Sequence, residues 1–172
     1  MKLFLKLSKY YLCIVKDRIM TDEQYMKEAL REAVQAREEG EIPIGAVIEC
    51  KGRIIARGHN MTERLNDPTA HAEMIALTAA TEALGGKYLT GCTLYVTVEP
   101  CPMCAAALNW AQISKVIWGA DDPKRGFTLF SAEPENPSGP VRGLLHPKTE
   151  TASGILSEDC SKLMTEFFRR KR

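Results

Sequence analysis

Apolar and polar side chains recur along the chain with two different spacings, and each spacing predicts one kind of secondary structure. Apolar residues return every three or four positions over 23–39, 71–84 and 156–169, which predicts amphipathic helices. Runs of β-branched and other apolar residues predict strands over 43–50, 53–57, 92–98 and 115–118. A Pro-Cys pair after the third strand predicts one further helix, which continues through Ala111.

The order of these elements predicts the fold class. One helix, a two-stranded hairpin around Lys51-Gly52, and then alternating helices and strands are typical of an α/β fold. We expect a three-layer α/β/α sandwich with a mixed β-sheet between the helices, formed as a single domain by residues 21–172. Residues 120–150 hold five of the nine prolines, so we expect a long loop there with room for a short strand.

Residues 1–20 precede this domain and permit three interpretations. Met20 is the true start, or the segment is an ordered extension, or it serves membrane association or targeting. The segment lacks the small-residue cleavage pattern of a signal peptide, and no apolar stretch in the chain approaches the roughly 20 residues that cross a bilayer. We therefore expect a cytoplasmic protein without a membrane span, whose six cysteines are thiols or metal ligands.

Composition and charge restrict the function further. The 172 residues are 45% hydrophobic and 26% charged, which excludes a disordered or collagen-like chain. The net charge of +1 hides an uneven distribution, because residues 1–20 and the last four residues each carry +4, which leaves −7 for the rest. A protein that coats nucleic acid would be basic throughout, so any nucleic-acid contact is expected to be local.

Two short segments carry residues suited to metal chemistry. His71-Ala72-Glu73 and Pro100-Cys101-Pro102-Met103-Cys104 each stand at a predicted helix start. Zinc takes imidazole and thiolate ligands together, and two cysteines three positions apart on a first helical turn can bind one ion. His71, Cys101 and Cys104 would leave the fourth position of a tetrahedral site open for water, as in catalytic sites. Glu73 would stand beside the metal, where a carboxylate can take up and pass on a proton.

Other interpretations of these residues exist. A Cys-x-x-Cys after a strand also occurs in thioredoxin-like redox proteins. A closed structural zinc site would need a fourth ligand from Cys50, Cys92 or His59. The spacing of His-x-Glu to Pro-Cys-x-x-Cys nevertheless leaves room for one helix, one turn and one strand, and this is the signature of zinc nucleobase deaminases.

The sequence resembles the cytidine-deaminase-like zinc hydrolases over residues 22–170, and within them the bacterial tRNA adenosine deaminases. The resemblance is carried by residues 41–47, 58–60, 66–73, 94–101, 154–156 and 167–169. It implies a cytidine deaminase-like fold, one zinc ion per chain, a homodimer, and conversion of adenosine to inosine at the wobble position in the anticodon loop of tRNA.

The same resemblance implies roles for four further residues. Asn60 should hydrogen-bond the base or its ribose, and the backbone N–H of Ala72 should meet the base edge. Asp122 and Lys124 match a loop that contacts the RNA strand in this family. The basic end of the chain, residues 169–172, is either a solvated helix end or a set of phosphate contacts.

A second substrate class stays open. Pro102 also resembles the residue found in guanine and cytosine deaminases, and the stretch from Arg125 to Thr128 and the His146-Pro147 pair depart from the tRNA-specific pattern. The alternative function is therefore deamination of a free base, guanine or cytosine, in salvage metabolism.

Overall fold

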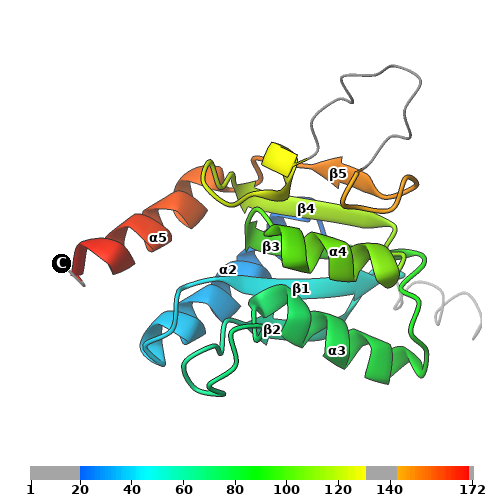
Figure 1. Ribbon diagram of the computed structural model, residues 1–172, viewed down its shortest axis with the longest axis horizontal. Helices are drawn as coiled ribbons and strands as arrows, with labels where there is room; N and C mark the ends of the chain where they lie inside the picture. The colour runs from blue at the N-terminus through cyan, green and yellow to red at the C-terminus, as the bar shows by residue number, and fades with distance from the viewer. Residues whose placement is uncertain (1–19, 131–142, 171–172) are drawn as a thin grey trace, which may run out of the picture.

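The computed structural model describes residues 20–130 and 143–170 (Figure 1). The interpretations of residues 1–19, 131–142 and 171–172 lie outside these described residues. None of the helices in the described part of the chain is long and apolar enough to span a bilayer.

A five-stranded mixed sheet forms the middle layer, in the order β2-β1-β3-β4-β5. The strand β1 pairs antiparallel with both β2 and β3, and β3, β4 and β5 are parallel. The strands span Gly45–Cys50 (β1), Arg53–His59 (β2), Cys92–Val98 (β3), Lys115–Ala120 (β4) and Glu150–Ala152 (β5). The sheet therefore has the mixed character that the order of elements predicts.

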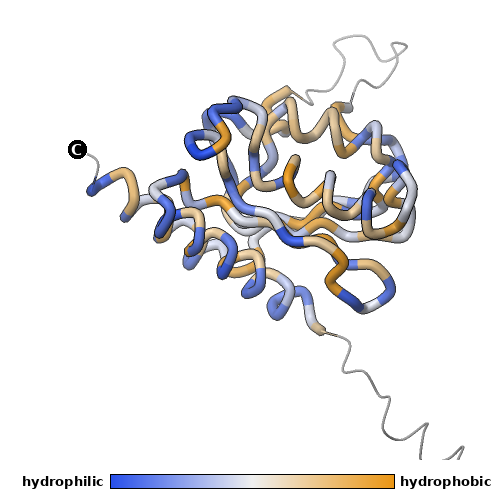
Figure 2. Tube along the Cα trace, turned by 90° about the horizontal axis from the view of Figure 1, so that it is seen from below, coloured by the Kyte–Doolittle hydropathy of each residue, from blue (hydrophilic) through white to orange (hydrophobic). Residues whose placement is uncertain are grey.

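Helices cover both faces of the sheet, which confirms the predicted three-layer α/β/α sandwich (Figure 1). The helices α3 and α4 bury small side chains such as Ala76 and Ala105 on one face, and α2 and α5 bury Met26 and Cys160 on the other. In Figure 2 the helix that leads to the C-terminus alternates between hydrophilic and hydrophobic, as an amphipathic helix should. The helices span Asp22–Glu38 (α2), Ala72–Leu84 (α3), Pro102–Trp110 (α4) and Ser157–Arg170 (α5).

Local signals define several of these boundaries. Thr21 accepts a hydrogen bond from the Gln24 N–H, and the Gln24 side chain bonds back to Thr21, which forms a capping box at the start of α2. Gly85 ends α3 in the left-handed conformation with φ 64°, which residues with a Cβ rarely adopt.

The long segment after β4 contains more structure than the sequence indicates. A single 3₁₀ turn, η1 (Phe127–Phe130), packs against α4, and β5 adds a short edge strand. The expected short strand is present, whereas the 3₁₀ turn was not predicted because its four residues have no detectable periodicity.

One close contact places α3 on the sheet. Gly58 in β2 has no side chain, and a Cβ there would lie 2.6 Å from both the Ala72 oxygen and the Ala76 nitrogen. Only glycine allows the backbone of α3 to approach β2 this closely. The first turn of α3 is therefore held directly against the end of β2.

Candidate metal centre and active site

The topology brings two helix starts together at one end of the sheet. Strands β2 and β3 are each antiparallel to β1 and therefore run in the same direction, so both end at the same side of the sheet. The helix α3 begins after β2 and the helix α4 begins after β3, and the two helices contact each other. His71 is the N-cap residue of α3, and Cys101 is the N-cap residue of α4.

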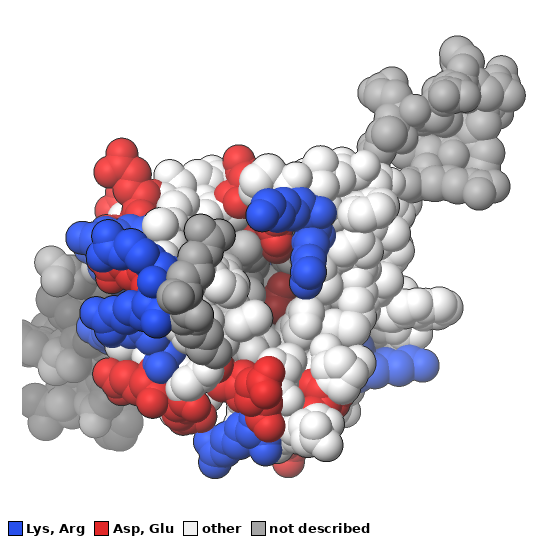
Figure 3. Space-filling view, turned by 60° about the vertical axis from the view of Figure 1, so that its left-hand side comes forward, with Lys and Arg blue, Asp and Glu red and all other residues white. Residues whose placement is uncertain are grey.

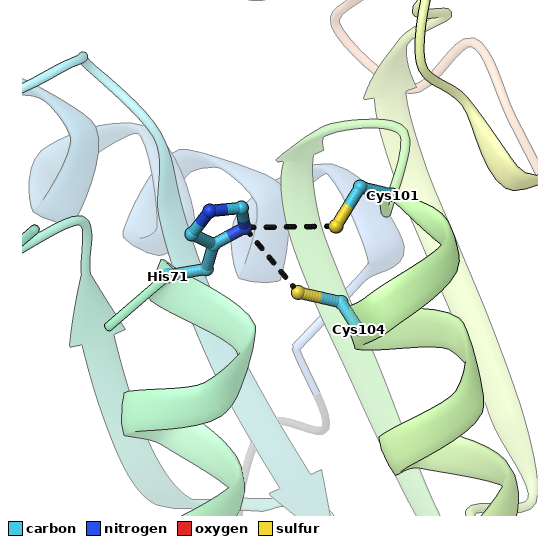
Figure 4. Close-up of side chains that lie close together, drawn as sticks. All are labelled: His71, Cys101 and Cys104. Carbon is cyan, nitrogen blue, oxygen red and sulfur yellow. Dashed lines mark hydrogen bonds between the residues drawn. The ribbon is translucent and has the colours of Figure 1, made fainter. Parts of the chain in front are cut away.

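His71, Cys101 and Cys104 point toward one another from these two helix starts (Figure 4). His71 Nδ1 lies 3.6 Å from Cys101 Sγ and 3.5 Å from Cys104 Sγ. In a tetrahedral zinc site, Zn–N near 2.05 Å and Zn–S near 2.3 Å place a nitrogen and a sulfur ligand about 3.6 Å apart. The side chains therefore have the separations that one zinc ion requires.

Within residues 20–130 and 143–170 this is the one group of three metal-ligating side chains, all of whose ligand atoms lie within 4.8 Å of one another. The expected ligands are thus brought together. Cys50 and Cys92 face each other across β1 and β3, and His59 contacts Glu32 and Glu39, so none of them supplies the fourth ligand of a closed site. A zinc ion held by three protein ligands would keep its fourth position for a non-protein ligand, as in catalytic sites.

The electrostatics of the group favour a thiolate. Hydrogen bonding from Cys104 and then from His71 lowers the pKa of the Cys101 thiol to about 4. The partial positive charge at the start of α4 acts in the same direction. A thiolate is the form of cysteine that binds zinc.

Glu73 lies in the first turn of α3, two positions beyond His71, and is almost entirely buried, with 4% of its surface exposed. Burial raises the pKa of its carboxyl to about 7. A group that gains and loses its proton near neutral pH is suited to general acid–base chemistry. Ala72, whose backbone N–H is expected to meet the base, is fully buried between these two residues.

Asn60 follows β2 directly and is also buried. Its Nδ2 donates to Glu41 Oε2 and to Thr62 Oγ1, each at 3.0 Å. Met61 N donates to the oxygen of Ala70 at 2.9 Å, which holds this segment beside the start of α3. Asn60 therefore precedes a residue that is hydrogen-bonded to Ala70, the residue before His71.

Asp122 and Lys124 lie in the loop after β4. Asp122 Oδ1 accepts hydrogen bonds from the backbone N–H groups of Lys124 and Arg125, so the carboxylate shapes the turn. The loop lies beside the metal ligands, because Phe127 N donates to the oxygen of Pro100 at 2.9 Å, next to Cys101. Figure 3 shows basic side chains beside a hollow that contains acidic atoms at depth.

Two buried glutamates near the site were not predicted as site residues. Glu41 binds the segment that contains Asn60, and Glu99 accepts hydrogen bonds from Asp122 N, Thr128 N and Thr128 Oγ1. The available signal was weak, since each is one acidic residue next to an apolar run. Their function depends on partners 19 to 29 positions away.

The fold and this arrangement of residues together define the class of zinc-dependent deaminases. Residues 19–120 match the family model described as the cytidine and deoxycytidylate deaminase zinc-binding region. The chain belongs to this deaminase family, whose members bind zinc.

Individual relatives are similar over most of the chain. A tRNA-specific adenosine deaminase of Bacillus subtilis (strain 168) is 46% identical over 156 residues, which are 88% of this chain and 91% of the relative. A tRNA-specific adenosine deaminase of Aquifex aeolicus is 44% identical over 89% of this chain and 97% of the relative.

Solved structures show the same fold. A structure from work on A-to-I editing by tRNA:A34 deaminases at the wobble position of transfer RNA superposes with a TM-score of 0.70 at 42% identity, over 81% of this chain and 97% of the other. The guanine deaminase of Bacillus subtilis superposes with a TM-score of 0.59 at 38% identity, over 69% of this chain and 79% of the other. The similarity is thus greater and more extensive toward the tRNA deaminase than toward this free-base deaminase.

Proposed function

We propose that this protein hydrolyses adenosine to inosine at the wobble position of tRNA, with one zinc ion per chain held by His71, Cys101 and Cys104. The single observation that carries the chemistry is the set of three ligand atoms at tetrahedral spacing beside the buried carboxylate of Glu73. The substrate is inferred from the tRNA-specific relatives, which are 39–46% identical to this chain.

Zinc bound to these three residues supplies a water nucleophile that is active at neutral pH. Glu73 takes up the proton of the attacking water and delivers a proton to the departing amine. A bond from the water oxygen to C6 of adenine forms, the bond from C6 to the exocyclic nitrogen breaks, and ammonia leaves. The second proton of the water ends on N1 of the ring, which leaves the C6 carbonyl of inosine. Asn60 and the N–H of Ala72 hold the base during these steps.

The adenosine must be accessible before it can enter this buried site. A nucleotide in an RNA loop is already unpaired, so flipping it out avoids much of the unstacking cost of a few kcal/mol. Lys124 and Arg125 provide positive charge on the loop that Phe127 joins to Pro100, the residue before Cys101. We infer that this loop, with Asp122, contacts the strand on either side of the flipped adenosine.

We further propose that the protein is a homodimer in the cytoplasm, where its tRNA substrate occurs. Trp110 in α4 is 83% exposed, and Leu129 and Phe130 of the adjoining η1 are also exposed. Large apolar side chains exposed on two contacting elements are suited to a protein interface. Trp118 is buried in the core by contrast, where it packs edge-to-face on Phe127.

Two measurements test the proposal. Purified protein should contain about one zinc per chain, the Cys101→Ala and His71→Ala variants should lose it, and the control Cys50→Ala should keep it. Full occupancy in either ligand variant would refute the assignment.

A substrate panel then decides the activity. The unaltered protein is incubated with an anticodon stem-loop that carries adenosine at position 34, the same stem-loop with guanosine there, and free adenosine, guanine and cytosine. We expect inosine from the first substrate alone. Rapid turnover of guanine or cytosine without reaction of the stem-loop would establish the free-base alternative.

A further inference from the structure

Glu41 is a buried carboxylate between α2 and β1 with no place in the chemistry described so far. It is only 1% exposed, and no basic side chain among residues 20–130 and 143–170 binds it. Burial by itself would raise its pKa, but hydrogen bonds from the backbone of Arg64 and Glu63 and from Thr62 and Asn60 hold the pKa below the usual value. Glu41 is therefore ionised and accepts hydrogen bonds without donating any.

The hydrogen bonds that the Glu41 carboxylate accepts all come from one short segment. Oε1 accepts from Arg64 N at 2.8 Å, and Oε2 accepts from Glu63 N at 3.2 Å, from Thr62 Oγ1 at 3.3 Å and from Asn60 Nδ2 at 3.0 Å. One side chain thus holds residues 60–64, which connect β2 to the loop before the metal-binding helix α3. Burying a charge is costly unless its hydrogen bonds are satisfied, and here four donors satisfy it.

The Glu41 carboxylate can only accept hydrogen bonds, and this determines how the side-chain amide of Asn60 is oriented. The NH2 group must face Glu41, and its second hydrogen is directed to Thr62 Oγ1 at 3.0 Å. The Oδ1 atom has no hydrogen-bond partner among the described residues. Among the described residues, Tyr25 Oη is the only buried side-chain nitrogen or oxygen atom without a hydrogen-bond partner. Because Asn60 Oδ1 also lacks a partner, it must be accessible to solvent.

We propose that Glu41 is a positioning residue for substrate binding: it holds Asn60 by the NH2 group and leaves Oδ1 to accept a hydrogen bond from the substrate. This inference rests on the proposed function. The ring nitrogens of adenine at positions 1, 3 and 7 carry lone pairs only, and Oδ1 cannot bond them. Asn60 therefore selects a donor, which in adenosine is a ribose hydroxyl or the exocyclic amine.

The first test is a double-mutant cycle of Glu41→Gln and Asn60→Ala, measured as kcat and KM on the substrate that the panel identifies. Glu41→Gln should reduce kcat/KM about 10- to 100-fold, as expected when a buried hydrogen-bond network loses its charged member. In the Asn60→Ala background the same change should cost less than about threefold, because its effect passes through Asn60. Zinc content should stay at one per chain, and Glu63→Gln, an exposed glutamate of the same segment, serves as the matched control.

The second test exchanges the carboxylate of Glu41 and the amide of Asn60. Asn60→Asp alone places two carboxylates in contact and should abolish most activity. Adding Glu41→Gln supplies a donor to the new carboxylate, keeps an acceptor toward the substrate, and should recover at least about tenfold in kcat/KM.

If the losses in kcat/KM of the two single variants multiply in the double variant, Glu41 acts independently of Asn60. Glu41 would then be a purely structural residue, and the proposal would be overturned. A Glu41→Gln/Asn60→Asp variant as inactive as Asn60→Asp would show that the substrate needs the NH2 group and would overturn it as well. Failure of the proposed function is distinguishable, because the panel with unaltered protein detects it before any variant is made.

Discussion

Replacing Gly58 with alanine should impair both folding and catalysis, because this residue sets the distance between β2 and the helix that carries His71 and Glu73. An alanine Cβ would lie 2.6 Å from the Ala72 oxygen and 2.6 Å from the Ala76 nitrogen, whereas ordinary contact begins at 3.4 Å. The backbone of α3 would therefore have to move by about 0.8 Å. No side-chain rotation can relieve the clash, since both atoms belong to the helix backbone.

This displacement should lower both the stability of the protein and its catalytic rate. Overpacking of a core typically costs about 1–3 kcal/mol, and a clash with backbone atoms belongs at the upper end of that range. For a chain of this length each kcal/mol corresponds to about 2–4 °C, so the melting temperature should fall by about 6–12 °C. A misplacement near 1 Å can cost about 100-fold in rate, so kcat should fall about 10- to 100-fold.

Thermal unfolding and single-turnover deamination of an A34 stem-loop would measure the two effects, with zinc content determined in parallel. Gly86→Ala is the matched control, because Gly86 has no atom within 4 Å of its added Cβ and follows the same helix. A Gly58→Ala protein with the melting temperature and kcat of Gly86→Ala would refute the argument.

Three further predictions concern the active site, the RNA contacts and the assembly. Glu73→Gln should keep zinc but lose about 10²- to 10⁴-fold in kcat, because glutamine cannot relay a proton; near-normal turnover would contradict this. Removal of residues 169–172 should raise KM for the stem-loop and weaken its salt dependence, whereas an unchanged salt slope would exclude phosphate contacts there. Trp110→Glu should shift sedimentation toward a monomer, and an unaltered profile would locate the interface elsewhere.

Much of the fold could be predicted from the sequence because its signals are local. The predicted strand over 92–98 coincides with β3, and the capping residue Thr21 and the left-handed Gly85 bound helices within one residue of the prediction. The strand predicted over 53–57 ends two residues too early, because glycine at position 58 resembles a strand terminator. In the folded chain Gly58 stays in β2 and accommodates α3, a contact that only the tertiary structure defines.

The candidate site could be predicted only in part, for the same reason. His71, Cys101 and Cys104 were expected to meet because their residue types and helix-start positions are typical of a zinc site, and the structure brings them together. Glu41 and Glu99 stand in segments that carry the family resemblance, but nothing in the sequence indicates what either carboxylate binds. Each binds a segment remote in sequence, so their importance emerges only once β2 and β4 have placed those segments beside them.

Glu99 connects the loop after β4 with the segment that carries the metal-binding cysteines. Its carboxylate anchors the loop at Asp122 and Thr128, while its backbone lies two positions before Cys101. A ligand that orders the loop and a metal ion bound by Cys101 and Cys104 would therefore both act on the position of Glu99. Any coupling free energy between them must be reciprocal, so that if RNA tightens the hold on zinc by some factor, zinc tightens the hold on RNA by the same factor.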